Sequence, residues 1–124
     1  MPKLLVIDDE IDIVEVTKRF FTKRGIETFA ASEGNEAIRI IQEENPDLIL
    51  LDYNLPGLSG KEILKKIREE LKLNTKVIMV TGFETEMVNN ETKDLGIHDC
   101  VHKPLDLNKL EKIVMAALNI KSHP

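Results

Sequence analysis

The chain has 124 residues, of which 42% are hydrophobic and 31% charged. It is therefore large enough and apolar enough to form one globular domain, and its composition is not that of a disordered chain. Its net charge of −5, from 22 acidic and 17 basic residues, argues against direct binding of nucleic acid. Apolar runs fall far short of the about 20 residues of a membrane span, and no signal-peptide pattern follows Met1. A single cysteine fits a reducing compartment, so we expect a cytoplasmic protein that does not enter the membrane.

Short apolar runs alternate with segments of helical periodicity along the chain. Three of the runs are continuously hydrophobic, which is typical of central parallel strands covered on both faces. The alternation repeats five times and predicts an α/β fold of (βα)5 type, a doubly wound parallel five-stranded sheet with helices on both faces. The predicted strands are residues 4–7, 28–31, 48–51, 77–80 and, more weakly, 99–101.

Helices are predicted in the segments between these runs, and several residues mark their ends. Apolar residues repeat at helical spacing over residues 13–20, 63–71 and 107–118. The fourth helix, about residues 85–95, has the weakest pattern because residues 87–90 are poor helix formers. The predicted end signals are Gly25, Pro46 and Gly96 as stops, a capping box of Ser59 with Glu62, and Asp106 as an N-cap.

Polar residues follow four of the predicted strands: Asp8 and Asp9, Asp52, Thr81, and Lys103. In an open α/β sheet, ligands bind beyond the carboxyl ends of the strands. Carboxylates gathered there repel one another unless a cation neutralises them, and oxygen ligands without nearby His or Cys suit Mg2+. A lysine and a hydroxyl could then bind a phosphoryl group carried by Asp52. The pattern therefore indicates phosphoryl transfer to a carboxylate.

Each signal also has an ordinary structural interpretation. Asp9 alone could cap the helix that follows it. Residues 52–57 alone could form a polar turn, and neither Thr81 nor Lys103 is informative by itself. Their convergence on one edge of the same sheet favours the functional interpretation.

Four motifs in this order carry a resemblance to a known family: Val6–Glu10, Leu50–Gly57, Val80–Gly82 and Lys103–Leu105. Over essentially its whole length the chain resembles the receiver domains of two-component response regulators. The resemblance implies a flavodoxin-like sheet of strand order 2-1-3-4-5. It also implies a single receiver domain over residues 1–124, with no output domain, that works as a phosphorylation switch and not as an enzyme.

The resemblance also implies partners and individual roles. The phosphoryl donor would be a sensor histidine kinase or a histidine phosphotransfer protein. The signal would leave through the face of the fourth helix, fifth strand and fifth helix, toward a protein target that the sequence does not name. The implied roles are Asp52 as phospho-acceptor, Asp9 as direct Mg2+ ligand, Asp8 as a ligand acting largely through water, Asn54 as a backbone-carbonyl ligand, Thr81 as switch hydroxyl, Lys103 as phosphate contact, and a cis peptide bond at Lys103–Pro104.

One position departs from the family pattern. Receiver domains usually carry Tyr or Phe three residues before the lysine, where this chain has Cys100. Phe83, two residues after Thr81, either takes part of that aromatic role or packs locally. The family also implies that Asn54 and Phe83 tune the lifetime of the acyl phosphate, and we expect the bulky Phe83 to slow its hydrolysis.

Other interpretations fit less well. A haloacid-dehalogenase-type phosphatase would carry a second carboxylate where Asn54 stands, and a flavodoxin would have a phosphate loop in place of residues 8–10. A zinc site on His98, Cys100 and His102 would place three ligands on one extended segment, which cannot close a tetrahedron. His123, in the tail, carries no signal. Met1 and the short tail after residue 120 favour a stand-alone regulator over a receiver excised from a larger protein.

Overall fold

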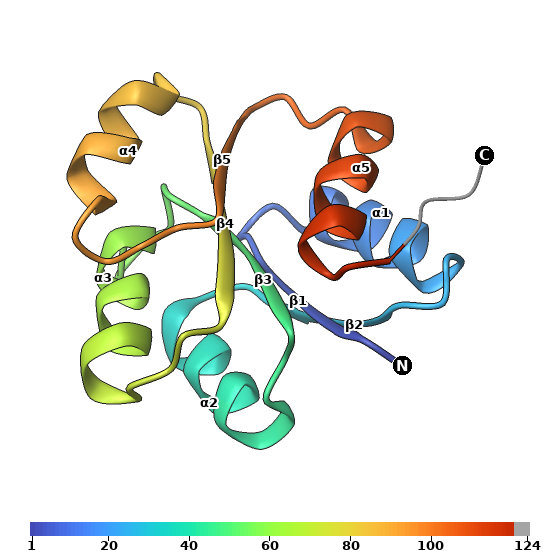
Figure 1. Ribbon diagram of the computed structural model, residues 1–124, viewed down its shortest axis with the longest axis horizontal. Coiled ribbons are helices and arrows are strands. Elements are labelled where there is room, and N and C mark those ends of the chain that lie inside the picture. The colour runs from blue at the N-terminus through green and yellow to red at the C-terminus, as the bar shows by residue number, and fades with distance from the viewer. Residues whose placement is uncertain (121–124) are drawn as a thin grey trace.

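The computed structural model describes residues 1–120 of the chain, which fold around one parallel sheet (Figure 1). Within this range five strands pair in the order β2-β1-β3-β4-β5. This confirms the predicted α/β class and strand order. The strands are β1 (Lys3–Ile7), β2 (Glu27–Ala31), β3 (Leu48–Asp52), β4 (Lys76–Thr81) and β5 (Asp99–His102). The helices are α1 (Ile11–Thr22), α2 (Gly34–Glu44), α3 (Gly60–Lys65) with its π-helical continuation η1 (Lys66–Glu70), α4 (Thr85–Thr92) and α5 (Leu107–Ala117).

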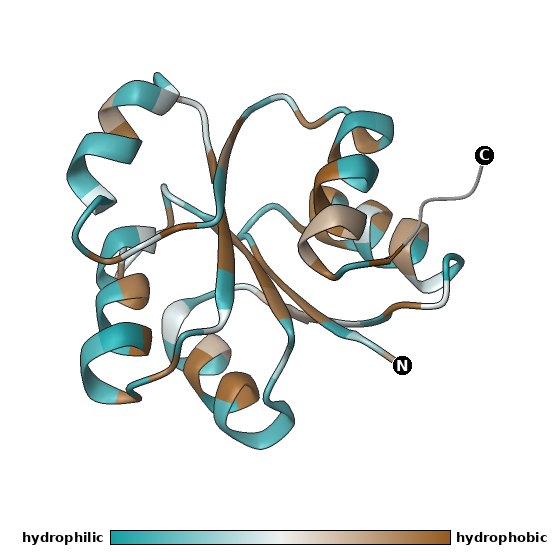
Figure 2. Ribbon diagram, viewed as in Figure 1, coloured by the Kyte–Doolittle hydropathy of each residue, from teal (hydrophilic) through white to brown (hydrophobic). Residues whose placement is uncertain are grey.

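Helices cover both faces of the sheet, as the alternation along the chain predicts. In Figure 1, α1 and α5 lie on one side of the strands and α2, α3 and α4 on the other. Side chains of β1 alternate between two cores. Leu4 packs with buried residues of α1 and α5, and Leu5 packs with buried residues of α2, α3 and α4, here called the α2–α4 cluster. All five residues of β3 are buried, because this central strand is covered on both faces. The hydrophobic residues accordingly line the strands and the inner faces of the helices (Figure 2).

Most predicted helix ends are confirmed. Gly25 follows α1 with φ of 81°, a backbone conformation that favours glycine, and Pro46 follows the end of α2. The capping box at Ser59 and the N-cap at Asp106 are both present. The fourth helix is shorter than predicted, because it ends at Thr92 and not near residue 95.

The carboxyl ends of β1 and β3 lie side by side at the centre of one sheet edge. β1 pairs with β2 on one side and with β3 on the other, so the strand order reverses at this point. In an open α/β sheet such a switch point leaves a crevice for a ligand. Within residues 1–120, no helix is long and apolar enough to cross a lipid bilayer.

Candidate functional site

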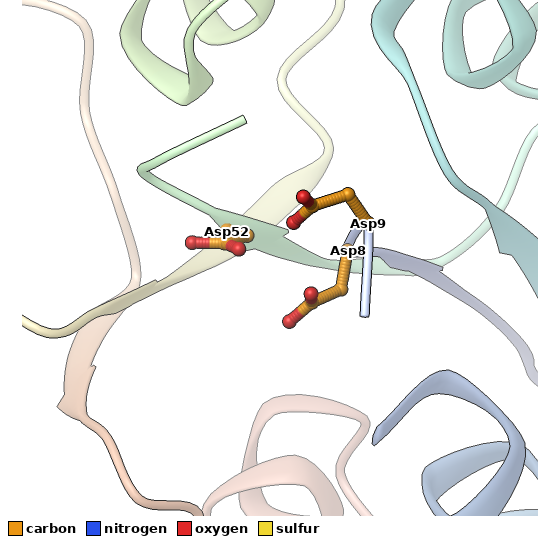
Figure 3. A group of neighbouring side chains, drawn as sticks. All are labelled: Asp8, Asp9 and Asp52. Atoms are coloured by element: carbon orange, nitrogen blue, oxygen red, sulfur yellow. The ribbon is translucent and has the colours of Figure 1, made fainter. Parts of the chain in front are cut away.

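Asp8, Asp9 and Asp52 come together where β1 and β3 end (Figure 3). Each offers one carboxylate oxygen, and these oxygens lie within 4.8 Å of one another. Asp8 and Asp52 are only 3% and 2% exposed, while Asp9 is exposed. A set of oxygen donors without nitrogen or sulfur fits a hard divalent cation such as Mg2+.

The surroundings of Asp8 disfavour its ionised form. Burial is the main cause and raises the pKa of the Asp8 carboxyl, and the charge of Asp52 raises it further. The backbone N–H of Glu10, which donates to Asp8 Oδ1 over 2.9 Å, and the ammonium of Lys103 lower it, but the net pKa is above the ordinary value. A cation at this edge would therefore stabilise the ionised form of this buried carboxyl and offset the charge of Asp52 beside it.

Lys103 places its ammonium among three carboxylates. Its Nζ lies 3.1 Å from Asp52 Oδ2, 3.3 Å from Asp8 Oδ2 and 3.4 Å from Glu10 Oε1. Burial alone would lower the pKa of Lys103, but the hydrogen bond to Asp52 and the charges of Asp52 and Asp8 outweigh it and raise the pKa. The ammonium is therefore present at neutral pH. The predicted cis peptide bond between Lys103 and Pro104 is confirmed.

Thr81 ends β4, one position beyond Val80, the register partner of Asp52. Its side chain is buried, and its Oγ1 accepts a hydrogen bond of 2.9 Å from the backbone N–H of Phe83. Because a hydroxyl can accept and donate at once, the hydroxyl proton remains able to bind an anionic oxygen.

The loop after Asp52 is held closely from both sides. The backbone N–H of Tyr53 donates to the Val80 carbonyl over 2.8 Å, and the Tyr53 carbonyl accepts from Gly60 N–H over 3.0 Å. The Asn54 N–H donates to Asp52 Oδ1 over 3.0 Å and orients that carboxylate. A Cβ on Gly60 would lie 2.5 Å from the Asp52 carbonyl oxygen, so only glycine allows this approach.

The predicted site residues thus come together at one edge of the sheet. Two of the alternative interpretations, Asp9 as a helix cap and a zinc site, are wrong. Glu10, not Asp9, occupies the N-cap position of α1, and the carboxylate of Asp9 lies with those of Asp8 and Asp52. Among residues 1–120, the acidic triad of Asp8, Asp9 and Asp52 is the one group of His, Cys, Asp or Glu side chains that could hold a metal. The zinc site on His98, Cys100 and His102 does not form there. His123 lies outside the described residues.

Sequence reasoning missed three contributors to this site. Glu10 belongs to the Val6–Glu10 motif, but its side chain contacts Lys103, 93 positions away. Gly60 matters through a backbone contact, and Tyr53 through a hydrogen bond from its hydroxyl to the carboxylate of Glu91 on α4. The available signals were the position of Glu10 directly after Asp9 and that of Tyr53 directly after Asp52.

Comparison with known proteins places the chain in a family. The sequence profile of the response regulator receiver domain matches residues 4–115. The chain belongs to the response regulator receiver family. Receiver domains accept a phosphoryl group in two-component signalling, interact with histidine kinases or phosphotransfer proteins, and bind Mg2+ at an acidic site.

Relatives of this receiver domain match it along nearly their full length. It is 37% identical over 122 residues to sporulation initiation phosphotransferase F of Bacillus subtilis (strain 168), covering 98% of this chain and 97% of that protein. The chemotaxis protein CheY4 of Vibrio cholerae is 28% identical with a TM-score of 0.88, covering 94% of this chain and 98% of that one. TrrA of Thermotoga maritima, solved in complex with Mg2+ and BeF, is 30% identical with a TM-score of 0.81, covering 94% and 99%. The phospho-accepting function predicted from the sequence is therefore confirmed.

Proposed function

We propose that this receiver domain takes the phosphoryl group on Asp52. The observation that carries the proposal is the position of this carboxylate, buried to 2% exposure, between the ammonium of Lys103 and the other two aspartates. A carboxylate oxygen of Asp52 would form the new bond to phosphorus as the bond from phosphorus to the donor's imidazole nitrogen breaks. The electron pair of that bond returns to the imidazole.

Other residues have supporting roles in this proposal. The ammonium of Lys103 binds a phosphoryl oxygen and offsets its charge, and the hydroxyl of Thr81 donates to another. The N–H of Asn54 keeps the Asp52 carboxylate oriented through the bond to Oδ1. The domain acts as a switch that catalyses its own phosphorylation and slow dephosphorylation, without processing a separate substrate.

The proposed Mg2+ ligands are Asp9, Asp52 and the backbone carbonyl of Asn54, with Asp8 acting largely through water. Bound there, the ion would offset the negative charge of the carboxylates and of the incoming phosphoryl group. The donor set supports this assignment, since three carboxylate oxygens lie within 4.8 Å of one another.

The metal assignment predicts a selective loss of Mg2+ binding in Asp9→Asn. We expect the affinity for Mg2+, measured by isothermal titration calorimetry, to fall about tenfold or more, because one charged ligand is lost. Thermal stability without Mg2+ should stay close to wild type, because Asp9 is exposed and Glu10 holds the N-cap position. Asp12→Asn, in the first turn of α1, is the matched control. Unchanged Mg2+ binding in Asp9→Asn would contradict the assignment.

We propose that the phosphodonor docks along α1 beside the site. A cavity of about 320 Å³ between α1 and the segment after β5 is lined mainly by apolar side chains and includes Val16 and Lys103. Val16 is 52% exposed and Ile11 is 68% exposed, which is unusual for side chains of this kind. Because Lys103 lines this cavity and also contacts Asp52, a donor bound there would reach the acceptor.

Val16→Glu tests this docking surface. Transfer from a phosphorylated histidine kinase or phosphotransfer protein is expected to slow about tenfold, which corresponds to about 1.4 kcal/mol at the interface. Labelling by acetyl phosphate should be unchanged, since that small donor needs no protein surface. Thr22→Glu, at the far end of α1, adds the same charge as a control. Equal slowing with both donors would place the defect in the site instead of in docking.

The signal is proposed to leave through α4, β5 and α5. Closing of Thr81 on the phosphoryl group would pull the loop after β4 toward Asp52, and α4 begins four residues after Thr81. β5 is the edge strand of the sheet, with its four residues half-buried or exposed, so a partner can reach it. A change can shift the equilibrium between two conformations only through contacts that differ between them.

Phe83 is proposed to slow hydrolysis of the acyl phosphate. Phe83 is 48% exposed, and its ring packs edge-on against Tyr53 in the acceptor loop, where we expect it to limit the approach of water. In Phe83→Ala we expect phosphate loss, followed by mass spectrometry after removal of acetyl phosphate, to be several-fold faster. The exposed Met87→Ala serves as the control. A lifetime equal to that of wild type would refute this role.

A further inference from the structure

A chain of contacts leads from the site to α4 through Tyr53. Thr81 Oγ1 accepts the N–H of Phe83, and the rings of Phe83 and Tyr53 meet edge-to-face with centroids 6.4 Å apart. The hydroxyl of Tyr53 in turn hydrogen-bonds to the carboxylate of Glu91 on α4. These contacts join the two loops that flank Asp52 to the helix that follows β4.

The body of α4 is held lightly by the core. Val88 and Thr92 are the two buried residues among the eight of α4, whereas α5 buries four of its eleven residues. Beyond the helix, the guanidinium of Arg68 donates to the carbonyls of Leu95 and Gly96 over 2.8 and 2.9 Å and secures that end. Within residues 1–120, the bond between Tyr53 and Glu91 is therefore the side-chain hydrogen bond that links the body of α4 to the loop after Asp52.

The residue in the family's usual aromatic position cannot provide this tie. Cys100 is paired in register with Met79 and packs with the α2–α4 cluster, whereas the register partner of Thr81 is His102. The aromatic contact closest in sequence to Thr81 is instead the Phe83–Tyr53 pair.

We propose that the Tyr53–Glu91 hydrogen bond is a latch that holds α4 in its unphosphorylated position. This proposal rests on the proposed function. When Thr81 closes on a phosphoryl group at Asp52, the N–H···Oγ1 bond carries Phe83 with it. The ring of Phe83 then displaces that of Tyr53, and the bond to Glu91 opens. Removing the latch should therefore favour the phosphorylated conformation and tighten binding of any ligand that selects it.

A double-mutant cycle on beryllofluoride binding tests the latch. The variants are Tyr53→Phe, Glu91→Ala, which removes the accepting oxygen, and the double variant, and the affinity for beryllofluoride is measured by calorimetry in saturating Mg2+. We expect each single variant to bind about fivefold more tightly, equivalent to about 1 kcal/mol. The double variant should bind no more tightly than either single one, because both remove the same bond. Glu86→Ala, which removes the same side chain from an exposed position of α4, should bind like wild type.

The possible outcomes separate the latch from the function it rests on. If wild type does not bind beryllofluoride, the proposed function fails. If wild type binds and the single variants match it, or bind more weakly, the latch is wrong. If the two effects multiply to about 25-fold in the double variant, the residues act independently and the latch is again wrong. Glu91→Ala changes an exposed helical side chain, so it retains the fold and decides the question even if Tyr53→Phe does not fold.

Discussion

Replacing Asp52 with Asn is expected to abolish labelling by acetyl phosphate and by a phosphohistidine donor. The amide is a poor nucleophile and cannot form the acyl phosphate, so no mass gain of one phosphoryl group should be detected. The fold should survive. Asn retains an oxygen to accept the Asn54 N–H, and Lys103 keeps Asp8 and Glu10 as ionic partners.

Asp94→Asn provides the matched control for this variant. Asp94 is exposed beyond the end of α4, so its loss should leave labelling at the wild-type rate. Circular dichroism and the thermal midpoint of each variant establish that it is folded. Labelling that persists in folded Asp52→Asn would show that another residue accepts the phosphoryl group.

Replacing Lys103 with Met is expected to slow phosphorylation about 100-fold, the loss typical of removing one group that stabilises charge in a transition state. Met keeps the apolar stem of the lysine and removes the ammonium that lies 3.1 to 3.4 Å from the three carboxylates. The initial rate of labelling by acetyl phosphate in saturating Mg2+ measures the effect. Lys109→Met, at an exposed position of α5, should react like wild type.

The same variant should be less stable without Mg2+, and the deficit should depend on pH. We expect the free energy of unfolding to fall by about 2 kcal/mol near neutral pH. This is less than the loss expected on breaking a fully buried ion pair, because Glu10 is exposed. The folded-state pKa of Asp8 is already raised, and losing the ammonium raises it further. Above that pKa, the ionised Asp8 carboxylate destabilises the folded variant. As the pH falls through that pKa, Asp8 becomes protonated, and the difference in stability between the variant and wild type shrinks.

Urea unfolding in EDTA at neutral and mildly acidic pH measures this deficit. A constant difference in the free energy of unfolding between Lys103→Met and wild type would show that the carboxylates are not its cause.

The sequence was sufficient to predict the sheet and the residues at its edge, for identifiable reasons. Buried strands such as β3 are uniformly apolar, so a polar residue at a strand's end, such as Asp52, stands out. Because parallel strands bring their carboxyl ends to the same edge of the sheet, motifs that are weak individually predict one common site.

Other features depend on distances that periodicity does not encode. The contact of Glu10 with Lys103 joins residues 93 positions apart, and the bond of Tyr53 to Glu91 joins residues 38 apart. Both pairs involve exposed glutamates, which in a sequence resemble any solvated charge. The end of α4 at Thr92 was missed because polar residues continue beyond it without a strong stop before Gly96.

The close fit of Gly60 against the peptide after Asp52 makes the loop after β3 differ from the segment after β4 in how tightly each is held. The Tyr53 N–H donates to β4, the Tyr53 carbonyl accepts from Gly60, and there is no room for a Cβ on Gly60. The loop after Asp52 is therefore held against displacement. The segment after Thr81 runs through exposed Gly82, where an added Cβ would meet nothing within 4 Å. We therefore expect a charge that arrives at Asp52 to displace the segment between β4 and α4 more readily than the loop between β3 and α3.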